Sequence, residues 1–462
     1  MRVRHGAVVT IGLVAAGALV ACTAPASPPA PAPAARSGAP RSSPPTRPAG
    51  DDWPMYHGTP DHAGHAAAMP PAGAPRLVHT LRLDGAVYAS PLVVRGLTIV
   101  ATENDSVYAF DAGYRQVWRQ HLGKPSPQSE RQCGNIDPLG ITGTPIADPA
   151  TGRILVVAEL GRQVRHVLYA LDLASGAVAW QRSVDLPGVS ARDMQQRGAL
   201  AIAHGRVWVS YGGQAGDCGD YKGRVVGVRL DGTGDPVAYT VPTRREGGIW
   251  NPAGPTVDHA GNLLVVSGNG AAFPGEAYDY SNSVMELDGN ARMIDSFAPA
   301  DWAARNPGDV DLGSVGVAVV GDRWAVVGGK SGPVYVLRQG ALGGIDGQAG
   351  ELDVCPVYGG AAVQGDVVYL PCEDGVRAVR VDGSGRLHVL WHADSSITGS
   401  PVIGGGRVWS LDTRGVLHAL DPATGRSVGQ VKVGQTSRFA TPAVSGSTLI
   451  VPTMSGIAVV RA

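Results

Sequence analysis

The sequence lacks an excess of either charge, because its 38 Lys and Arg residues are balanced by 39 Asp and Glu residues, for a formal net charge of −1. This balance provides no strong field for holding phosphate backbones, so nucleic acid is excluded as the main partner. Charged residues make up only 17% of the 462 residues, and there are only 4 Phe. A coiled coil or helix bundle, which is rich in Ala, Glu, Lys and Leu and poor in Gly, is also excluded.

Short catalytic motifs are scarce as well. No Gly-x-Ser-x-Gly nucleophile elbow and no C-x-x-C pair occurs, which removes the main support for a serine hydrolase, a zinc site, a redox motif or a c-type haem. Gly329-Lys330-Ser331 is not a phosphate loop, because Trp324 stands where the first Gly is required. Asp309-Val310-Asp311 begins like a calcium loop, but Val320 stands at its last position instead of Glu.

Gly and Pro are abundant, with 65 and 35 residues, beside 44% hydrophobic residues. The apolar content can fill a core, so the chain is not disordered as a whole. Frequent Gly and Pro with few charges indicate strands joined by turns.

The first 50 residues predict export. A basic start is followed by an uncharged apolar run over residues 6–21, too short for a permanent membrane span. Leu19-Val20-Ala21-Cys22 resembles the lipobox of bacterial lipoproteins, which implies a signal peptide over residues 1–21 and a lipid on Cys22. An ordinary signal peptide with a buried Cys is the alternative. The Pro-, Ala- and Ser-rich residues 22–50 predict a disordered spacer, and we expect anchoring to the outer face of the cell membrane.

The other four Cys residues agree with an oxidising compartment. Cys355 and Cys372 flank a predicted hairpin, Val357 to Leu370, so we expect them to pair. Cys133 and Cys218 then form the second disulfide. Four free buried thiols are the alternative.

One supersecondary pattern recurs eight times, at intervals of about 40–60 residues. Its openings are Ser90-Pro91-Leu92-Val93, Thr144-Pro145-Ile146-Ala147, Leu200-Ala201-Ile202-Ala203, Gly254-Pro255-Thr256-Val257, Gly316-Val317-Ala318-Val319, Gly360-Ala361-Ala362-Val363, Ser400-Pro401-Val402-Ile403 and Thr441-Pro442-Ala443-Val444. A β-branched strand, a third strand such as Leu417-His418-Ala419-Leu420-Asp421 and a fourth strand after a tight turn follow each opening. Four antiparallel strands per unit are typical of a β-propeller blade.

The last unit has no outer strand of its own after Gly456 to Arg461, whereas Arg76 to Leu83 has the alternation of an outer strand before the first full unit. Pairing of these two segments would close the ring and leave no long unpaired edge. We therefore predict one all-β domain over residues 51–462. It is an eight-bladed β-propeller of four-stranded antiparallel blades, closed by strand 76–83 on the C-terminal blade.

The repeat of Ser-Pro-Val, Gly-x-Val-Tyr/Trp, Tyr-Ala-Leu-Asp and a later Trp resembles the PQQ-type propeller repeat of the quinoprotein superfamily. The segment Asp52-Trp53-Pro54-Met55-Tyr56-His57-Gly58 resembles the opening of these domains, so the resemblance covers the chain after the spacer. It implies the fold but no single function. The repeat occurs in quinone-dependent dehydrogenases, in lipoproteins of the outer-membrane assembly type and in exported proteins that bind no quinone.

The dehydrogenase version implies a PQQ site over the central channel, with a calcium ion. Val266-Ser267-Gly268-Asn269-Gly270 resembles the segment whose Asn binds calcium, and Asp309-Val310-Asp311-Leu312-Gly313 resembles the segment with the catalytic Asp. Gly329-Lys330-Ser331-Gly332 resembles the turn whose Lys or Arg reaches the quinone. The resemblance thus implies Asn269 as a ligand of calcium and a cofactor contact, Asp309 or Asp311 as the catalytic base, and Lys330 as a cofactor contact.

The sequence departs from that family in several respects. It has no adjacent Cys pair for stacking a quinone and no haem motif, no calcium-binding Glu can be assigned, and the loops are short for excluding water from a cofactor. The alternative interpretations are a turn residue for Asn269, turn caps or solvated loop residues for Asp309 and Asp311, and a solvated hairpin tip for Lys330.

Two further groups of residues have competing interpretations. His57, His62 and His65 form a candidate metal cluster, although a surface loop is the preferred interpretation. The three Trp residues at the ends of outer strands are interpreted as packing between blades; they are Trp118, Trp180 and Trp391.

The preferred function is an exported, membrane-anchored propeller that acts as a binding or scaffold module. We expect a monomer without a cofactor that presents a loop-rich face to an envelope protein or a small ligand. That face is placed at Gly123–Leu139, Tyr211–Lys222 and Phe273–Asn282, whose aromatic residues would anchor a partner. These residues are Tyr211, Tyr221, Phe273, Tyr278 and Tyr280. The alternative is a PQQ- and calcium-dependent alcohol or sugar dehydrogenase.

Overall fold

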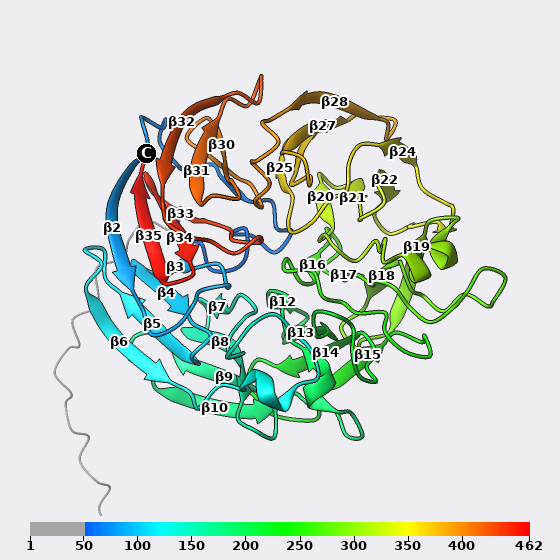
Figure 1. The fold of residues 1–462 in the computed structure, drawn as a ribbon, viewed down its shortest axis with the longest axis horizontal. Helices are drawn as coiled ribbons and strands as arrows, with labels where there is room; N and C mark the ends of the chain where they lie inside the picture. The colour runs from blue at the N-terminus through cyan, green and yellow to red at the C-terminus, as the bar shows by residue number, and fades with distance from the viewer. Residues whose placement is uncertain (1–50) are drawn as a thin grey trace, which may run out of the picture. The chain divides into compact units, whose positions relative to one another are not determined.

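The computed structural model describes residues 51–462, which form eight antiparallel sheets arranged as the blades of a propeller (Figure 1). The predicted fold class is confirmed, and each of the eight openings supplies an innermost strand. The predicted signal peptide, the lipid on Cys22 and the spacer lie outside the described residues. Among the described residues, no helix has the length and apolar character needed to span a membrane.

The first four blades run in chain order. They comprise β3 (Leu92–Val94), β4 (Leu97–Ala101), β5 (Ser106–Phe110) and β6 (Gln116–His121); β7 (Ile146–Asp148), β8 (Arg153–Leu160), β9 (Arg165–Asp172) and β10 (Val178–Ser183); β12 (Ala201–Ala203), β13 (Arg206–Gly213), β14 (Arg224–Arg229) and β15 (Val237–Thr240); and β16 (Thr256–Val257), β17 (Leu263–Val266), β18 (Val284–Leu287) and β19 (Met293–Ala298).

The last four blades complete the ring. They comprise β20 (Ala318–Val320), β21 (Trp324–Val327), β22 (Pro333–Arg338) and β24 (Gly350–Asp353); β25 (Ala362–Gln364), β26 (Val367–Leu370), β27 (Arg377–Val381) and β28 (Leu387–His392); β29 (Val402–Gly404), β30 (Arg407–Leu411), β31 (Val416–Leu420) and β32 (Ser427–Lys432); and β33 (Ala443–Ser445), β34 (Thr448–Thr453), β35 (Gly456–Arg461) and β2 (Arg76–Arg82).

Short elements extend three blades or connect them. They are β1 (His65–Ala66), β11 (Met194–Gln195), β23 (Gly344–Ile345), α1 (Trp302–Arg305), η2 (Gln128–Glu130), η3 (Ala191–Asp193) and η4 (Asn306–Gly308). The strand β1 pairs in parallel with β29, and β23 pairs in parallel with β19.

The core lies between neighbouring blades. Inner strands are covered on both faces, so they are apolar along their length; every residue from Ile154 to Leu160 in β8 is buried. The outermost strands have one open face, and β10 and β32 therefore alternate in exposure.

The three outer-strand Trp residues pack between blades, as predicted. The Trp118 Nε1 donates a hydrogen bond to Leu173 O of the next blade at 3.0 Å, and Trp391 Nε1 donates to Pro422 O at 2.8 Å. A Cβ at Gly176 would lie 2.5 Å from the Trp118 ring, and Gly176 has a φ of +71°. The glycine of the tight turn is therefore required both by the backbone and by the indole that covers it.

The ring closes at the predicted strand. β2 pairs with β35 in antiparallel register, with Thr80 opposite Ala458 and Leu81 opposite Ile457, and a bulge at Val78 (Figure 1). Asp84, directly after β2, accepts hydrogen bonds from Thr102 and other donors of the first blade. The N-terminal strand thus ties the last blade to the first.

Residues 53–72 cross one end of the channel along the inner strands. Pro54 O accepts a hydrogen bond from Ala147 N at 2.8 Å, and Pro60 O accepts one from Val257 N at 2.9 Å. Further along, Ala63 O accepts one from Val363 N at 2.7 Å. This segment contacts blades on opposite sides of the ring, so the channel is closed at this end.

The surface-loop interpretation of the His cluster is wrong for two of its members. His57 and His62 are buried beside Tyr56 in the crossing segment, and His57 Nδ1 lies 3.1 Å from His62 O. Burial lowers the pKa of His57 to about 3 and that of His62 to about 4, so both are neutral. Among residues 51–462, no group of three or more His, Cys, Asp or Glu side chains is placed to hold a metal ion.

Candidate functional site

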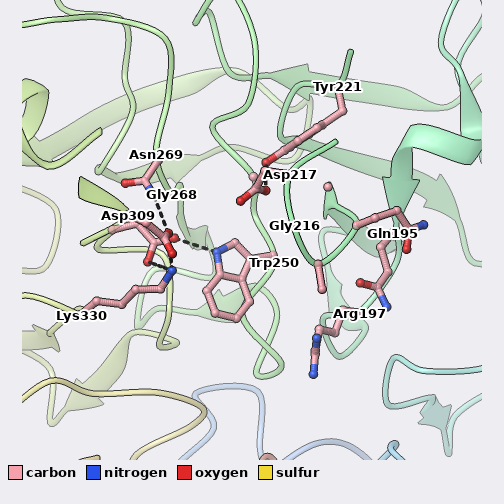
Figure 2. A pocket seen from close by; sticks show the side chains of 15 residues that line it. Gln195, Arg197, Gly216, Asp217, Tyr221, Trp250, Gly268, Asn269, Asp309 and Lys330 are labelled. Atoms are coloured by element: carbon pink, nitrogen blue, oxygen red, sulfur yellow. Dashed lines mark hydrogen bonds and ion pairs between the residues drawn. The ribbon is translucent and has the colours of Figure 1, made fainter. Parts of the chain in front are cut away.

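The open end of the channel carries two adjoining cavities, of about 200 Å³ and about 580 Å³. Successive strands of a blade alternate in direction, so the connections after its second and fourth strands lie on one face. All four candidate site residues come from such connections and line the smaller cavity: Asn269 after β17, Asp309 and Asp311 before β20, and Lys330 after β21 (Figure 2). The structure therefore brings the four predicted residues together.

Asp311 lies at the centre of this group and is 2% exposed. Its Oδ2 accepts a hydrogen bond from Trp250 Nε1 at 2.9 Å, and its Oδ1 lies 3.3 Å from Lys330 Nζ. Burial raises the pKa of Asp311 to about 6, against the lowering effects of Lys330 and Trp250. This carboxyl group can therefore change its protonation state near neutral pH. The solvated-loop interpretation is wrong for Asp311.

Lys330 is half-buried and pairs with both carboxylates, with its Nζ 2.6 Å from Asp309 Oδ1. Burial lowers the pKa of Lys330, but the charges of Asp311 and Asp309 outweigh it and raise the pKa above its usual value. The side chain is held inside the cavity rather than extended into solvent as a hairpin tip (Figure 2). Asp309 itself is exposed and has a left-handed backbone conformation, as a turn residue would.

Asn269 reaches the same cluster through its amide, because its Nδ2 donates to Asp309 Oδ1 at 2.9 Å. Its Oδ1 is buried and accepts no hydrogen bond from the described residues. Asp311 Oδ1 likewise accepts no hydrogen bond among residues 51–462 beyond its ion pair with Lys330. Two oxygen atoms thus retain unused acceptor capacity at this site.

Close backbone approach makes the cluster possible. A Cβ at Gly268 would lie 2.6 Å from Asp311 Oδ2, and one at Gly329 would lie 2.5 Å from Asp311 O. Lys330 N also donates to Asp311 O at 2.9 Å. The glycines next to Asn269 and Lys330 therefore let three connections meet around one carboxyl group.

Sequence reasoning missed Trp250 and Arg197, which line both cavities. Trp250 places its indole between the Asp311 cluster and Arg197 (Figure 2). Trp250 comes just before a blade opening, at Gly254, where the connection to the new blade crosses the face of the ring. Asp311 likewise comes just before a blade opening, at Gly316. A position shortly before an opening is therefore the sequence signal that could have identified Trp250.

The larger cavity lies on the channel axis, because seven of the eight connections between blades line it. Its aromatic side chains are Tyr88, Trp250, Tyr358 and Phe439. Arg438 stacks on Tyr358, with its guanidinium carbon 4.0 Å from the ring centroid. A mouth with aromatic walls and cationic side chains suits a planar ligand with negative charge.

Both predicted disulfides are present, Cys133–Cys218 and Cys355–Cys372. Cys133–Cys218 joins the connection after the first blade to the β13–β14 loop, where Gly216 lines the smaller cavity. Two disulfides agree with an exported, oxidising location.

Two of the five proposed aromatic anchors are corrected. Tyr211 and Tyr221 are buried, at 3% and 4% exposed, because Tyr211 packs in the core of the second and third blades and Tyr221 packs on Gly213. Phe273 is 58% exposed, and Tyr278 and Tyr280 are half-buried against one another.

Several known proteins are similar to this chain in sequence or in fold. The family model described as outer membrane protein assembly factor BamB matches residues 72–210. The quinohemoprotein alcohol dehydrogenase of Comamonas testosteroni is 16% identical, with 89% of this chain and 80% of that chain covered and a TM-score of 0.67. A europium-containing methanol dehydrogenase is 13% identical, with 90% and 98% covered and a TM-score of 0.66.

BamB from Moraxella catarrhalis is 16% identical, with 84% of this chain and 99% of that chain covered and a TM-score of 0.57. The sequence matches none of the curated proteins. Identities this low establish the fold and leave the function to the site. Residues 72–210 thus match a PQQ-like repeat model, and the chain has the β-propeller fold that quinoprotein dehydrogenases and BamB share.

Proposed function

We propose that this protein is an exported, membrane-anchored propeller that binds a small planar ligand at the open mouth of its channel. The anchor rests on the sequence at Cys22 and on the spacer that follows. The ligand site rests on one observation: connections from separate blades bring Trp250, Asp311 and Lys330 together in a cavity. Buried charges and acceptors without a hydrogen bond raise the free energy of the folded protein unless a bound group pairs with them. Such a cluster at a cavity therefore favours a binding site.

The quinone PQQ, a planar aromatic carboxylate, is the ligand with which to test the proposal. We expect it to quench the fluorescence of the wild-type protein on titration. Lys330→Met removes the cation of the cluster and should weaken binding at least about tenfold, or about 1.4 kcal/mol. Lys432→Met, on the exposed outer strand β32, is the matched control and should bind as the wild type does. Equal affinity of all three proteins would reject this site.

A PQQ-dependent dehydrogenase is the second candidate, and Asp311 favours it. Its pKa of about 6 lets it accept a proton near neutral pH, and the adjacent cation of Lys330 stabilises the carboxylate form. Trp250 would hold the quinone ring and Lys330 its oxygens. When bound, PQQ supplies the two-electron acceptor. Asp311 would then orient a substrate hydroxyl group and take its proton.

The chain supplies a partial shell for calcium. Asn269 Oδ1 and Asp311 Oδ1 are the two buried oxygens with free acceptor capacity in the cluster, whereas Ca²⁺ takes six to eight oxygen ligands. Asp309 and Asp311 also face the Lys330 ammonium group, which repels a cation. These residues therefore fit a quinone better than they fit a calcium ion bound by protein alone.

Turnover separates the two candidates. Protein supplied with PQQ and calcium is assayed with alcohols and aldoses and an artificial electron acceptor. Dye reduction by the wild type, lost in Asp311→Asn while PQQ binding persists, would establish the dehydrogenase. Quinone binding without dye reduction would leave the binding function alone.

An envelope protein as partner on the same face has less support. The family model that matches residues 72–210 is described as an outer membrane protein assembly factor. However, Phe273 is the one exposed side chain among the five proposed anchors, and hot spots of protein interfaces are usually clusters of large side chains. Shortening of the 273–280 loop should therefore leave capture of envelope proteins unchanged, and lost capture would favour the scaffold function.

A further inference from the structure

Arg197 is a half-buried cation that forms no ion pair in the described part of the chain. It lies in the connection between β11 and β12 and lines both cavities. Its guanidinium carbon is 4.7 Å from the centroid of the Phe439 ring, which comes from the connection before β33. Between residues 51 and 462, Arg197 forms no ion pair or hydrogen bond, although the charge of the buried Glu103 acts on it from beyond ion-pair distance.

The other two cations at the mouth are paired. Lys330 Nζ lies 2.6 Å from Asp309 Oδ1 and 3.3 Å from Asp311 Oδ1. Arg438 Nη2 lies 3.6 Å from Glu373 Oε1. Since these pairs already balance Lys330 and Arg438, Arg197 is left as the cation available to a ligand.

The surroundings of Arg197 also favour its availability to an anionic ligand. Burial lowers its pKa, a sign that the charged form is poorly solvated, although a guanidinium group stays protonated. A planar guanidinium group matches the oxygens of a carboxylate or a phosphate in two parallel hydrogen bonds. Phe439 holds one face of the group and also lies against Trp250, with ring centroids 6.4 Å apart.

We infer that the ligand of this site carries an anionic oxygen group that Arg197 binds while its aromatic ring lies on Trp250. The inference rests on the proposed ligand-binding function and specifies its chemical class. Arg197 is then the residue that determines specificity for an anion, and the Asp311 cluster contacts the opposite end of the ligand.

Three probes with the same ring test the charge requirement: 2-naphthoate, 2-naphthyl phosphate and the neutral 2-naphthamide, each titrated by calorimetry. We expect at least one of the anionic probes to bind the wild type about tenfold or more tighter than the amide. Arg197→Gln should remove that preference and leave amide binding unchanged. The stronger of the two anionic probes identifies the group.

Arg192→Gln is the matched control, because Arg192 lies in η3, just before β11, but is exposed and outside both cavities. This variant should keep the full preference. Equal binding of amide and anions by the wild type, or a preference that survives in Arg197→Gln, would overturn the inference.

Anions without an aromatic ring distinguish the anion-binding role of Arg197 from the proposed binding of a planar ligand. If no naphthalene probe binds, the planar-ligand proposal fails, and millimolar oxalate or inorganic phosphate then decides on Arg197 alone. A rise in the Tm of the wild type that is absent in Arg197→Gln supports the anion site. The same response in both proteins rejects it.

Discussion

At the scale of single residues, the site depends on one carboxyl group held between an indole and an ammonium group. Burial of Asp311 raises its pKa, and its two partners lower it again. The result is a pKa of about 6. Trp250 donates to one oxygen and Lys330 faces the other. Removal of either partner should therefore raise the pKa of Asp311.

This arrangement predicts a fluorescence change without any ligand. The difference in emission between the wild type and Trp250→Phe should titrate with a midpoint near pH 6, because the indole donates to the Asp311 carboxylate. Lys330→Met should move the midpoint upward, since Lys330 lowers the pKa of Asp311. A difference spectrum that is constant across this range, or that titrates equally in Asp311→Asn, would contradict the assignment.

At the scale of elements, connections between strands carry the site, and cross-links hold them. Cys133–Cys218 spans 85 residues of sequence and Cys355–Cys372 spans 17. A disulfide stabilises chiefly by constraining the unfolded chain, and a longer closed segment gives a larger effect. The two bridges should therefore differ in energy and, because only the first borders the smaller cavity, in their effect on binding.

Replacement of each pair by Ser measures this difference. In denaturant titrations, Cys133→Ser with Cys218→Ser should lower the free energy of unfolding by about 4.6 kcal/mol, and Cys355→Ser with Cys372→Ser by about 3 kcal/mol. The first pair of substitutions should also weaken ligand binding at the channel mouth. A larger loss of stability from the second pair would contradict the entropic account.

Closure by β2 is the second prediction about elements. Thr80→Pro with Leu81→Pro removes two adjacent backbone donors from β2, one of which faces β35 because successive N–H groups of a strand point to opposite sides. We expect a loss of roughly 2–3 kcal/mol in the free energy of unfolding. Light scattering should also show association that depends on concentration, because the uncovered edge of β35 can pair with another chain.

The bulge in β2 provides the control for closure. Val78→Pro places the same residue where the register skips a partner, so it should cost less than the double substitution. Equal losses from both variants would mean that β2 contributes packing rather than strand pairing.

At the scale of the whole molecule, the ring encloses ionisable groups whose pKa values differ from those in the unfolded chain. His166 is buried, with Nδ1 2.7 Å from Asp185 Oδ1 and Nε2 3.3 Å from Glu159 Oε2. These carboxylates overcome the cost of burial and raise the pKa of His166 to about 10. Asp105 has both carboxyl oxygens buried without a hydrogen-bond partner, and burial raises its pKa to about 9.

Stability should therefore fall as the pH rises above neutrality. A raised pKa contributes stability below the unfolded pKa that is lost as the pH rises through the folded pKa. From about pH 7 to pH 9, the folded protein keeps protons on His166 and Asp105 that the unfolded chain releases. The free energy of unfolding should therefore fall by at most about 2.7 kcal/mol per pH unit, or about 1.4 for each proton. Denaturant titrations across this range measure it.

Asp105→Asn isolates one of the two protons. The amide cannot ionise, so the slope should fall by about half and the variant should be more stable than the wild type at alkaline pH. Asp366→Asn, at an exposed turn of the sixth blade, should keep the wild-type slope. An unchanged slope in Asp105→Asn would show that Asp105 is ionised in the folded protein.

His57 and His62 act in the opposite direction on the acidic side. Their pKa values are lowered by burial, so the stability that they contribute is present above about pH 6.5 and is lost as the pH falls toward 4 and 3. The sequence predicted neither histidine to be buried, because the segment that carries them lacks the periodicity of a strand and gains its burial only from the inner strands of the ring.

The amino-acid sequence determined what neighbouring residues decide. Gly176 beside a tight turn, the β-branched second strands, the eight openings and the alternation of Arg76 to Leu83 are local patterns, and each predicted its element correctly. Cys355 and Cys372 paired as expected because a hairpin brings its own ends together.

Tertiary structure decided the contacts that no local pattern carries. The resemblance of their segments placed Asp311 and Lys330 at one site, but Trp250 joins them only because ring closure turns successive connections toward one axis. No pattern within a blade encodes an angle between blades. For the same reason Tyr211 was predicted to be an exposed anchor and is buried: its burial comes from the neighbouring blade. Arg197 remained unnoticed because the lack of a partner is a property of the whole ring, and a sequence shows only which partners exist.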